Sequence, residues 1–258
     1  MTAFSRCALI ACALLLSSVG CAHMPGAPEA GSEVSRPDKE LDFHVLYKEN
    51  CSGCHGDNGR GGAAIPLNNP AYLAVTGAQN LRTATAKGIN GTMMPAFDQN
   101  SGGMLTDQQV DALVQGMLQE WSRPSDFASI ALPTYLATTP ANAADGQKTY
   151  AIACARCHGD DGTGVKAASA TTGQQGATPH SIVDRSYLTL VSDQSLRSYV
   201  IAGHLDDNAP DWRSYISGRP LTSQEITDVV AWIAAHRTSA EQSANRPSSS
   251  GVAAKERP

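Results

Sequence analysis

The stretch Cys51-Ser-Gly-Cys54-His55-Gly56 has a second copy in the chain, Cys154-Ala-Arg-Cys157-His158-Gly159. The pattern Cys-x-x-Cys-His is the attachment signature of c-type haem. In such a site the two cysteines form thioether bonds to one haem, and the histidine is the proximal ligand of its iron. The sequence therefore predicts two covalent haem c groups, one held by Cys51, Cys54 and His55 and the other by Cys154, Cys157 and His158.

Two other uses of a Cys-x-x-Cys pair fit this chain poorly. Pairs that form a zinc site are usually about 15–20 residues apart, whereas nearly a whole domain separates Cys54 from Cys154. A thioredoxin-like redox motif would need a βαβ pattern around it, and the sequence has none. Haem attachment is the interpretation that remains.

The chain contains an internal repeat. Residues 66–97 align with residues 181–212 without a gap, and the matched positions are Tyr72-Leu73 with Tyr187-Leu188, Gln79 with Gln194, Leu81-Arg82 with Leu196-Arg197, Gly88 with Gly203, and Pro95 with Pro210. One haem motif precedes each of the two aligned stretches, and each motif with the stretch that follows it forms one repeat. We therefore expect two tandem domains with the same architecture.

Each repeat is predicted to be all-α, with the order helix, haem motif, loop, helix, loop, helix. The last helix of each begins with a capping box, Thr106 with Gln109 and Thr222 with Glu225. Apolar residues then recur at helical spacing, which indicates a buried face. We expect about three to four helices around each haem.

Two matched pairs of side chains in the repeats suggest contacts with the haem. Tyr47 and Tyr150 each lie four residues before the first cysteine of a motif. One helical turn would put them beside the first thioether, so we expect them to pack on the haem. Arg82 and Arg197 also match, and two roles stay open for them: partners of haem propionates or charges on a helix surface.

With both motifs and a Met-Pro pair placed, each repeat resembles a class I cytochrome c domain, over residues 38–123 and 142–237. The resemblance implies that the methionine directly before proline is the second iron ligand. In Met93-Met94-Pro95 that residue is Met94, and Met93 is the alternative.

The second repeat departs from this family pattern, because Ala209 stands before Pro210 and no methionine follows Met117. Three outcomes stay open for its haem. His204 binds the iron; another side chain such as His180 or Lys166 does so; or the position is open. An open haem would allow a peroxidase-like reaction, although no acid–base constellation is evident. If the second ligand is not a thioether, the Met94 haem has the higher potential.

The resemblance also implies close packing of the first and last helices of each domain, with a small residue facing an aromatic one. In the second repeat Gly146 and Trp232 fit this pattern. In the first, the aligned residues are Phe43 and Gly116, so large and small have exchanged helices. We expect Phe43 near Gly116 and Trp232 near Gly146.

The N-terminus predicts export. Arg6 precedes an apolar run of signal-peptide length, too short for a membrane span. Ser18-Val19-Gly20-Cys21 resembles a lipoprotein cleavage site, so we expect a signal peptide at 1–20, a lipid anchor on Cys21 and a tether at 21–37. Residues 124–141 are predicted to be a linker of modest stiffness, and residues 238–258 a disordered tail.

The net charge of −5 argues against nucleic acid as a partner and suits docking to a basic redox protein. The expected function is electron transfer by two haems in a respiratory or oxidative chain, at the periplasmic or outer face of the cytoplasmic membrane. Such a chain would not transform a substrate. A fixed cytochrome subunit of a quinol–cytochrome c oxidoreductase or an oxidase is the alternative.

Overall fold

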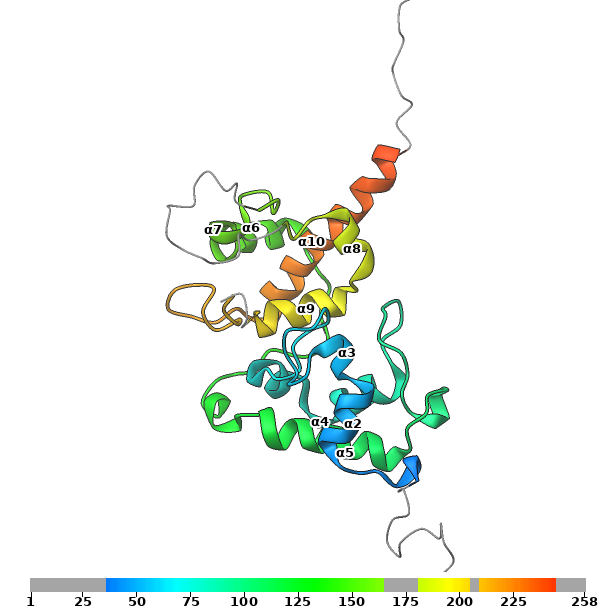
Figure 1. The fold of residues 1–258 in the computed structure, drawn as a ribbon. Coiled ribbons are helices and arrows are strands. Elements are labelled where there is room, and N and C mark those ends of the chain that lie inside the picture. The colour runs from blue at the N-terminus through cyan, green and yellow to red at the C-terminus, as the bar shows by residue number, and fades with distance from the viewer. Residues whose placement is uncertain (1–35, 165–180, 205–208, 245–258) are drawn as a thin grey trace, which may run out of the picture. The chain divides into compact units, whose positions relative to one another are not determined.

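The computed structural model describes residues 36–164, 181–204 and 209–244, with side chains as far as Arg237. In this part of the chain the regular structure is helical, with only isolated β-bridges, and the all-α prediction is confirmed (Figure 1). The predicted signal peptide, Cys21, Lys166 and His180 lie outside the described residues.

The first domain begins after a short 3-10 helix, η1 (Pro37–Lys39). The side chains of Asp42, Asn69 and Thr106 accept hydrogen bonds at the N-termini of its three longer helices, and the predicted Thr106–Gln109 capping box is present. Its elements are α2 (Phe43–Asn50), α3 (Ser52–His55), α4 (Pro70–Lys87), the 3-10 helix η2 (Gln99–Ser101) and α5 (Asp107–Trp121).

The second domain follows the 3-10 helix η3 (Pro124–Phe127). It consists of α6 (Ala143–Ala153), α7 (Ala155–His158), α8 (Arg185–Leu190), α9 (Asp193–Ala202) and α10 (Ser223–Ala244). The capping box between Thr222 and Glu225 is formed here too, with backbone–side-chain bonds of 2.8 and 3.2 Å. Helix α10 continues to Ala244, so the predicted tail begins too early: Thr238 to Ala244 belong to the helix.

The helices follow the sequence repeat in detail. Helix α4 is interrupted at Gly77, whose φ of 65° is not helical. The matched position in the second domain is Ser192, which with Val191 separates α8 from α9 and caps α9 through its hydroxyl. The two halves of α4 therefore correspond to α8 and α9.

The predicted contact between Phe43 and Gly116 is present. A Cβ atom added to Gly116 would lie 2.2 Å from the Phe43 ring, so the ring occupies the space that a side chain on α5 would need. Phe43 also packs edge-on against Trp121, with ring centroids 5.4 Å apart. A bulky residue on α2 is thus accommodated because α5 has glycine at the crossing point.

In the second domain the close approach is to the backbone of the partner helix. A Cβ on Gly146 would lie 1.9 Å from the carbonyl oxygen of Asp228 on α10, one turn before Trp232, and the proximity of Gly146 to Trp232 itself stays a prediction. Trp232 stacks on Tyr150, with ring centroids 4.1 Å apart. Here glycine allows backbone-to-backbone contact of α6 with α10, and the aromatic pair packs one turn further along each helix.

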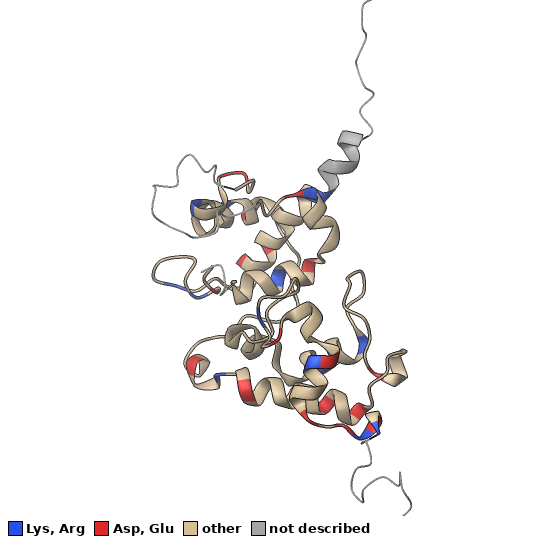
Figure 2. Cartoon of the chain, viewed as in Figure 1, with Lys and Arg blue, Asp and Glu red and all other residues tan. Residues whose placement is uncertain are grey.

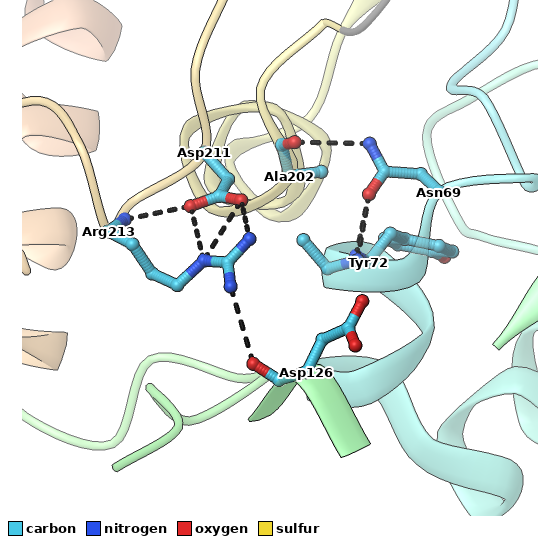
Figure 3. Close-up of polar contacts among 7 residues, drawn as sticks. Asn69, Tyr72, Asp126, Ala202, Asp211 and Arg213 are labelled. Atoms are coloured by element: carbon cyan, nitrogen blue, oxygen red, sulfur yellow. Dashed lines mark hydrogen bonds and ion pairs between the residues drawn. The ribbon is translucent and has the colours of Figure 1, made fainter. Parts of the chain in front are cut away.

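The segment predicted to be a linker packs against both domains. Phe127 of η3 is buried and stacks on Trp212 at 5.9 Å, and the guanidinium of Arg213 lies 4.6 Å from the Phe127 ring centroid. Arg213 also pairs with Asp211 and donates to the carbonyl of Asp126 (Figure 3). These contacts belong to a buried apolar cluster, hereafter the shared core, of Ala71, Phe127, Ala153, Ile201, Trp212, Leu221 and Ile226.

One polar contact joins the two domains directly. Asn69 caps α4 through its Oδ1 atom, and its Nδ2 donates to the carbonyl of Ala202 at the end of α9, 3.1 Å away (Figure 3). Asn69 is fully buried, so both ends of its amide are satisfied without water. The cap of one domain therefore also satisfies the helix end of the other.

Candidate haem sites

Both haem motifs have the same backbone conformation. Helix α2 ends at Cys51, the next residues form the single turn α3, and Gly56 follows with a φ of 82°. Helix α6, the turn α7 and Gly159, with a φ of 77°, repeat this arrangement. At Gly56 a Cβ would lie 1.6 Å from the carbonyl oxygen of Arg60, which explains why glycine follows the histidine.

A tyrosine fixes each motif to the helix before it. The hydroxyl of Tyr47 donates to the carbonyl of Gly56 at 2.9 Å, and that of Tyr150 to the carbonyl of Gly159 at 2.6 Å. Burial raises the pKa of both phenols, so they remain protonated donors. The predicted packing of these rings on the haem stays a prediction; their contact with the motif is a hydrogen bond that the sequence spacing did not indicate.

His55 has the environment of a metal ligand. Its ring is buried, and Nδ1 donates to the carbonyl of Ile65 at 2.7 Å. This bond leaves the lone pair on Nε2, a buried atom with no hydrogen-bond partner among the described residues. Ligating histidines are commonly oriented in this way by a backbone carbonyl. Burial lowers the pKa of His55, which favours the neutral ring that iron requires. The site therefore fits a haem iron at Nε2.

The first cysteine of each motif is more enclosed than the second. Cys51 and Cys154 are buried and half-buried, while Cys54 and Cys157 are exposed. Burial, with a smaller contribution from the neighbouring cysteine, raises the pKa of the Cys51 and Cys154 thiols to about 12. The interior around them therefore suits an uncharged sulfur, as in a thioether.

In the first domain the loop after α4 presents Met94 and not Met93 to the protein. Met93 is 88% exposed, whereas Met94 is half-buried. The backbone of Met94 is held on both sides, because its carbonyl accepts from the amide of Ile89 at 3.1 Å and its amide donates to the Thr92 hydroxyl at 3.2 Å. The assignment of Met94 as the second iron ligand stays a prediction, and its geometry is favourable.

The matching loop of the second domain has one of the same backbone bonds around Ala209. The amide of His204 donates to the carbonyl of Ala209 at 3.1 Å, as Ile89 does to Met94. Gly88 and Gly203 close the two helices with φ angles of 70° and 66°. A Cβ on either would come within 2.8 Å of the loop backbone, at Met94 and Pro95 or at Ala209 and Pro210. Ala209 thus stands in the structural position of Met94.

A second unsatisfied buried atom lies near this loop. Trp212 is fully buried, and its Nε1 has no hydrogen-bond partner among the described residues. The aligned residue in the first domain is Phe97, which has no donor. A polar group supplied by a bound cofactor would satisfy this N–H, so the second site also fits a haem. In the sequence Trp212 aligns with Phe97, and its N–H group was therefore not recognised as part of a site.

The two matched arginines, Arg82 and Arg197, have different roles in the structure. Arg82 forms ion pairs with Asp107 and Asp111 of α5, at 2.7 and 2.6 Å. Arg197 is buried, and it donates to the carbonyls of Thr134 and Tyr135 and to the hydroxyl of Thr227. Burial lowers the pKa of Arg197. Arg82 therefore acts as a helix-surface charge, and Arg197 fastens the linker to the second domain.

The acidic residues are not spread evenly over the described surface. Helix α5 carries Asp107, Asp111 and Glu120 and has no lysine or arginine (Figure 2). Arg82 pairs with two of these carboxylates, and Glu120 lies 3.0 Å from His44. Arg82 therefore offsets one of these three negative charges, and α5 keeps an acidic surface.

Comparison with known families assigns each half separately. Residues 41–115 match the family described as cytochrome c oxidase, cbb3-type, subunit III, and residues 143–237 match the family described as cytochrome c. The two ranges coincide with the two domains of the structure. None of the described helices is long and apolar enough to span a bilayer.

Three curated relatives are subunits of cbb3-type cytochrome c oxidases. The CcoP subunit of Cereibacter sphaeroides is 28% identical over 131 residues, covering 47% of this chain and 40% of that protein. CcoP of Azospirillum sp. is 29% identical over 158 residues, or 55% and 48%. FixP of Sinorhizobium medicae is 30% identical over 128 residues, or 46% and 38%. The chain thus spans less than half the length of each.

Among solved structures, a chain of the Kuenenia stuttgartiensis reducing HAO-like protein complex is similar, and 99% of that chain is covered. The TM-score is 0.44 and the sequence identity is 17%, and a TM-score this low carries no argument. The family matches do carry one, because each half of the chain has its own match and its own Cys-x-x-Cys-His site. The chain is a dihaem c-type cytochrome, made of two tandem cytochrome c domains that each bind one haem c covalently.

Proposed function

We propose that this chain transfers single electrons between redox proteins of a respiratory chain and does not transform a substrate itself. The observation that carries the proposal is the repetition of one site: a motif turn bonded to a tyrosine, twice in one chain. A haem c iron supplies the chemistry when bound, since it changes between ferric and ferrous states by one electron. Two such sites suit a carrier that passes electrons through itself.

The protein's contribution is to keep the ligands in place. His55 is fixed by its bond to Ile65, and the Met94 backbone is held by Ile89 and Thr92. Side chains that cannot move keep the ligand set the same in both oxidation states. Fixed ligands and a buried proximal histidine reduce the rearrangement that accompanies each electron, which is what an electron carrier requires.

A redox titration of the haem-loaded, full-length protein tests this proposal. We expect two one-electron transitions, the Met94 haem having the higher potential because a thioether ligand favours ferrous iron. Met94→Ala should lower that potential and abolish the sulfur–iron charge-transfer absorption. Met93→Ala, at the exposed neighbour, is the matched control and should change neither. A single transition, or equal effects of the two variants, would contradict the proposal.

We also propose that the protein works outside the cytoplasmic membrane, attached by a lipid on Cys21. The support is the apolar run after Arg6, the Gly20-Cys21 pair and the two c-haem motifs, since bacterial c-haem is attached outside that membrane. Cys21→Ser should release the protein from membranes to the soluble periplasmic fraction. If this variant stays in the membrane fraction, the anchor is wrong.

The second candidate is a fixed place in a membrane oxidase complex. It is favoured by the match of residues 41–115 to the cbb3-type subunit III family and by the names of the curated relatives. Both candidates transfer electrons and differ in mobility. Affinity purification of the tagged protein from detergent-solubilised membranes separates them: stoichiometric oxidase subunits indicate a fixed subunit, and the cytochrome alone indicates a mobile carrier.

A further inference from the structure

The aligned segments 84–97 and 199–212 differ at most of their positions, and three of these differences bear on the second ligand of the iron. The first domain has Ala84, Ile89 and Met94, and the second has Tyr199, His204 and Ala209. One backbone bond is common to both domains, from the amide of Ile89 to the carbonyl of Met94 and from the amide of His204 to the carbonyl of Ala209. The return bond, from the Ala209 amide to the His204 carbonyl, has no counterpart, because the Met94 amide donates to the Thr92 hydroxyl. The three differences therefore lie on or next to segments that have one backbone bond in common.

The bridge between His204 and Ala209 determines where their side chains point. It is antiparallel, and both of its hydrogen bonds are formed, at 3.1 and 3.0 Å. Residues directly opposite in such a pair place their side chains on the same face, with Cα atoms about 5.5 Å apart. The imidazole of His204 thus leaves the backbone on the same face as the methyl group of Ala209, the residue that aligns with Met94.

We propose that His204 is the sixth ligand of the second haem iron and replaces, from across the bridge, the methionine that Ala209 cannot supply. The inference rests on the proposed function, because it takes the Met94 position as the ligand position. A methyl group at residue 209 leaves room for an imidazole beside it. The bond needs only the lone pair of a neutral imidazole nitrogen, so no electron is gained or lost when it forms.

Tyr199 is the third substitution, and it contacts this histidine. Its ring lies nearly parallel to the imidazole, at 20°, with centroids 6.3 Å apart. The matched residue Ala84 has no ring that could contact Ile89. The domain that has His204 therefore also has an aromatic residue, Tyr199, next to it. Residues 205–208, Leu-Asp-Asp-Asn, include no methionine, histidine or lysine that would compete for the iron.

Low-temperature EPR of the oxidised, haem-loaded full-length protein tests the proposal. The wild type should show two low-spin haems, one with histidine–methionine and one with bis-histidine coordination. His204→Ile, which installs the residue of the first domain, should convert only the second haem to a high-spin form that binds carbon monoxide when reduced. His204→Ile with Ala209→Met should restore low-spin iron with a thioether ligand, a gain that a poorly folded variant could not give.

Two results would overturn the proposal. A high-spin second haem in the wild type would mean that the position is open, and an unchanged bis-histidine signal in His204→Ile would mean that another residue is the ligand. The Met94→Ala variant identifies failure of the underlying assumption separately. If that variant leaves the first haem's signal unchanged, the ligand position itself is wrong, whatever the outcome at His204.

Discussion

The hydroxyl of Tyr150 lies 2.6 Å from the carbonyl oxygen of Gly159, so helix α6 is bonded to the far end of the haem motif that follows it. The same bond joins Tyr47 to Gly56 in the first domain, at 2.9 Å. Each glycine closes the turn that holds the proximal histidine. The two tyrosines therefore position the histidines through the backbone and not by touching them.

Tyr150→Phe should lower the free energy of unfolding by about 1 kcal/mol, the usual net contribution of one hydrogen bond. Tyr150→Ala should cost about 3–5 kcal/mol, because it also removes the ring stacked on Trp232 at 4.1 Å. Denaturant unfolding of the haem-loaded protein measures both. Equal losses for the two variants would show that the hydroxyl contributes little beyond packing.

Gly116→Ala should be destabilising although alanine is the better helix former. The substitution gains about 1 kcal/mol in helix propensity. The new methyl group, however, would lie 2.2 Å from the Phe43 ring, and overpacking costs about 1–3 kcal/mol. Combining it with Phe43→Ala should remove the clash, so the two changes are expected to be non-additive in a double-mutant cycle. Additive effects would mean that the two residues do not meet.

Arg197→Met should destabilise the second domain by about 2–4 kcal/mol, because it removes the Arg197 donors from the buried Thr227 hydroxyl and from the part-buried carbonyl of Thr134. Arg82→Met is the matched control at the same position of the repeat. Its partners are exposed carboxylates, whose ion pairs contribute little, so the expected loss is clearly smaller than that of Arg197→Met. Thermal unfolding compares them directly, and similar losses would contradict the difference in burial.

The Arg219–Glu225 ion pair should make stability depend on pH. The hydrogen bond from the Arg219 guanidinium lowers the pKa of Glu225 from 4.5 to about 2, and the Thr222 amide and hydroxyl contribute to a smaller extent. A depressed folded-state pKa stabilises the fold fully above pH 4.5, and this contribution declines below that value and is lost as the pH falls through about 2. Glu225→Gln, which keeps a capping box like that of Thr106 and Gln109, should therefore destabilise the protein at pH 7 and be neutral at the acid end. Unfolding measured across this range checks the sign.

Features that depend on local sequence were predicted well. The haem motifs and both capping boxes involve residues within a few positions of one another, where spacing alone determines the outcome. The contact between Phe43 and Gly116 was also predicted. The family resemblance implied that the first and last helices cross there, and the sequence has a large residue on one helix and a small residue on the other.

Contacts between distant segments were not predictable in the same way. The acceptor of the His55 ring is the backbone carbonyl of Ile65, which leaves no mark in the side-chain sequence. The approach of Gly146 to the backbone at Asp228 was not predicted, because the relative rotation of two helices depends on all of their contacts. Arg197 matches Arg82 in sequence, yet only the second domain has a linker packed over it.

Because of the shared core, the two domains cannot be separated without exposing buried apolar side chains. Phe127 and Trp212 bury each other, and Ala71 of the first domain belongs to the same apolar cluster. Expressing the two repeats as separate proteins would give two fragments, each with an exposed apolar surface at its part of the shared core. Such fragments should aggregate or demand a solubilising partner, even though each retains a full haem-attachment motif.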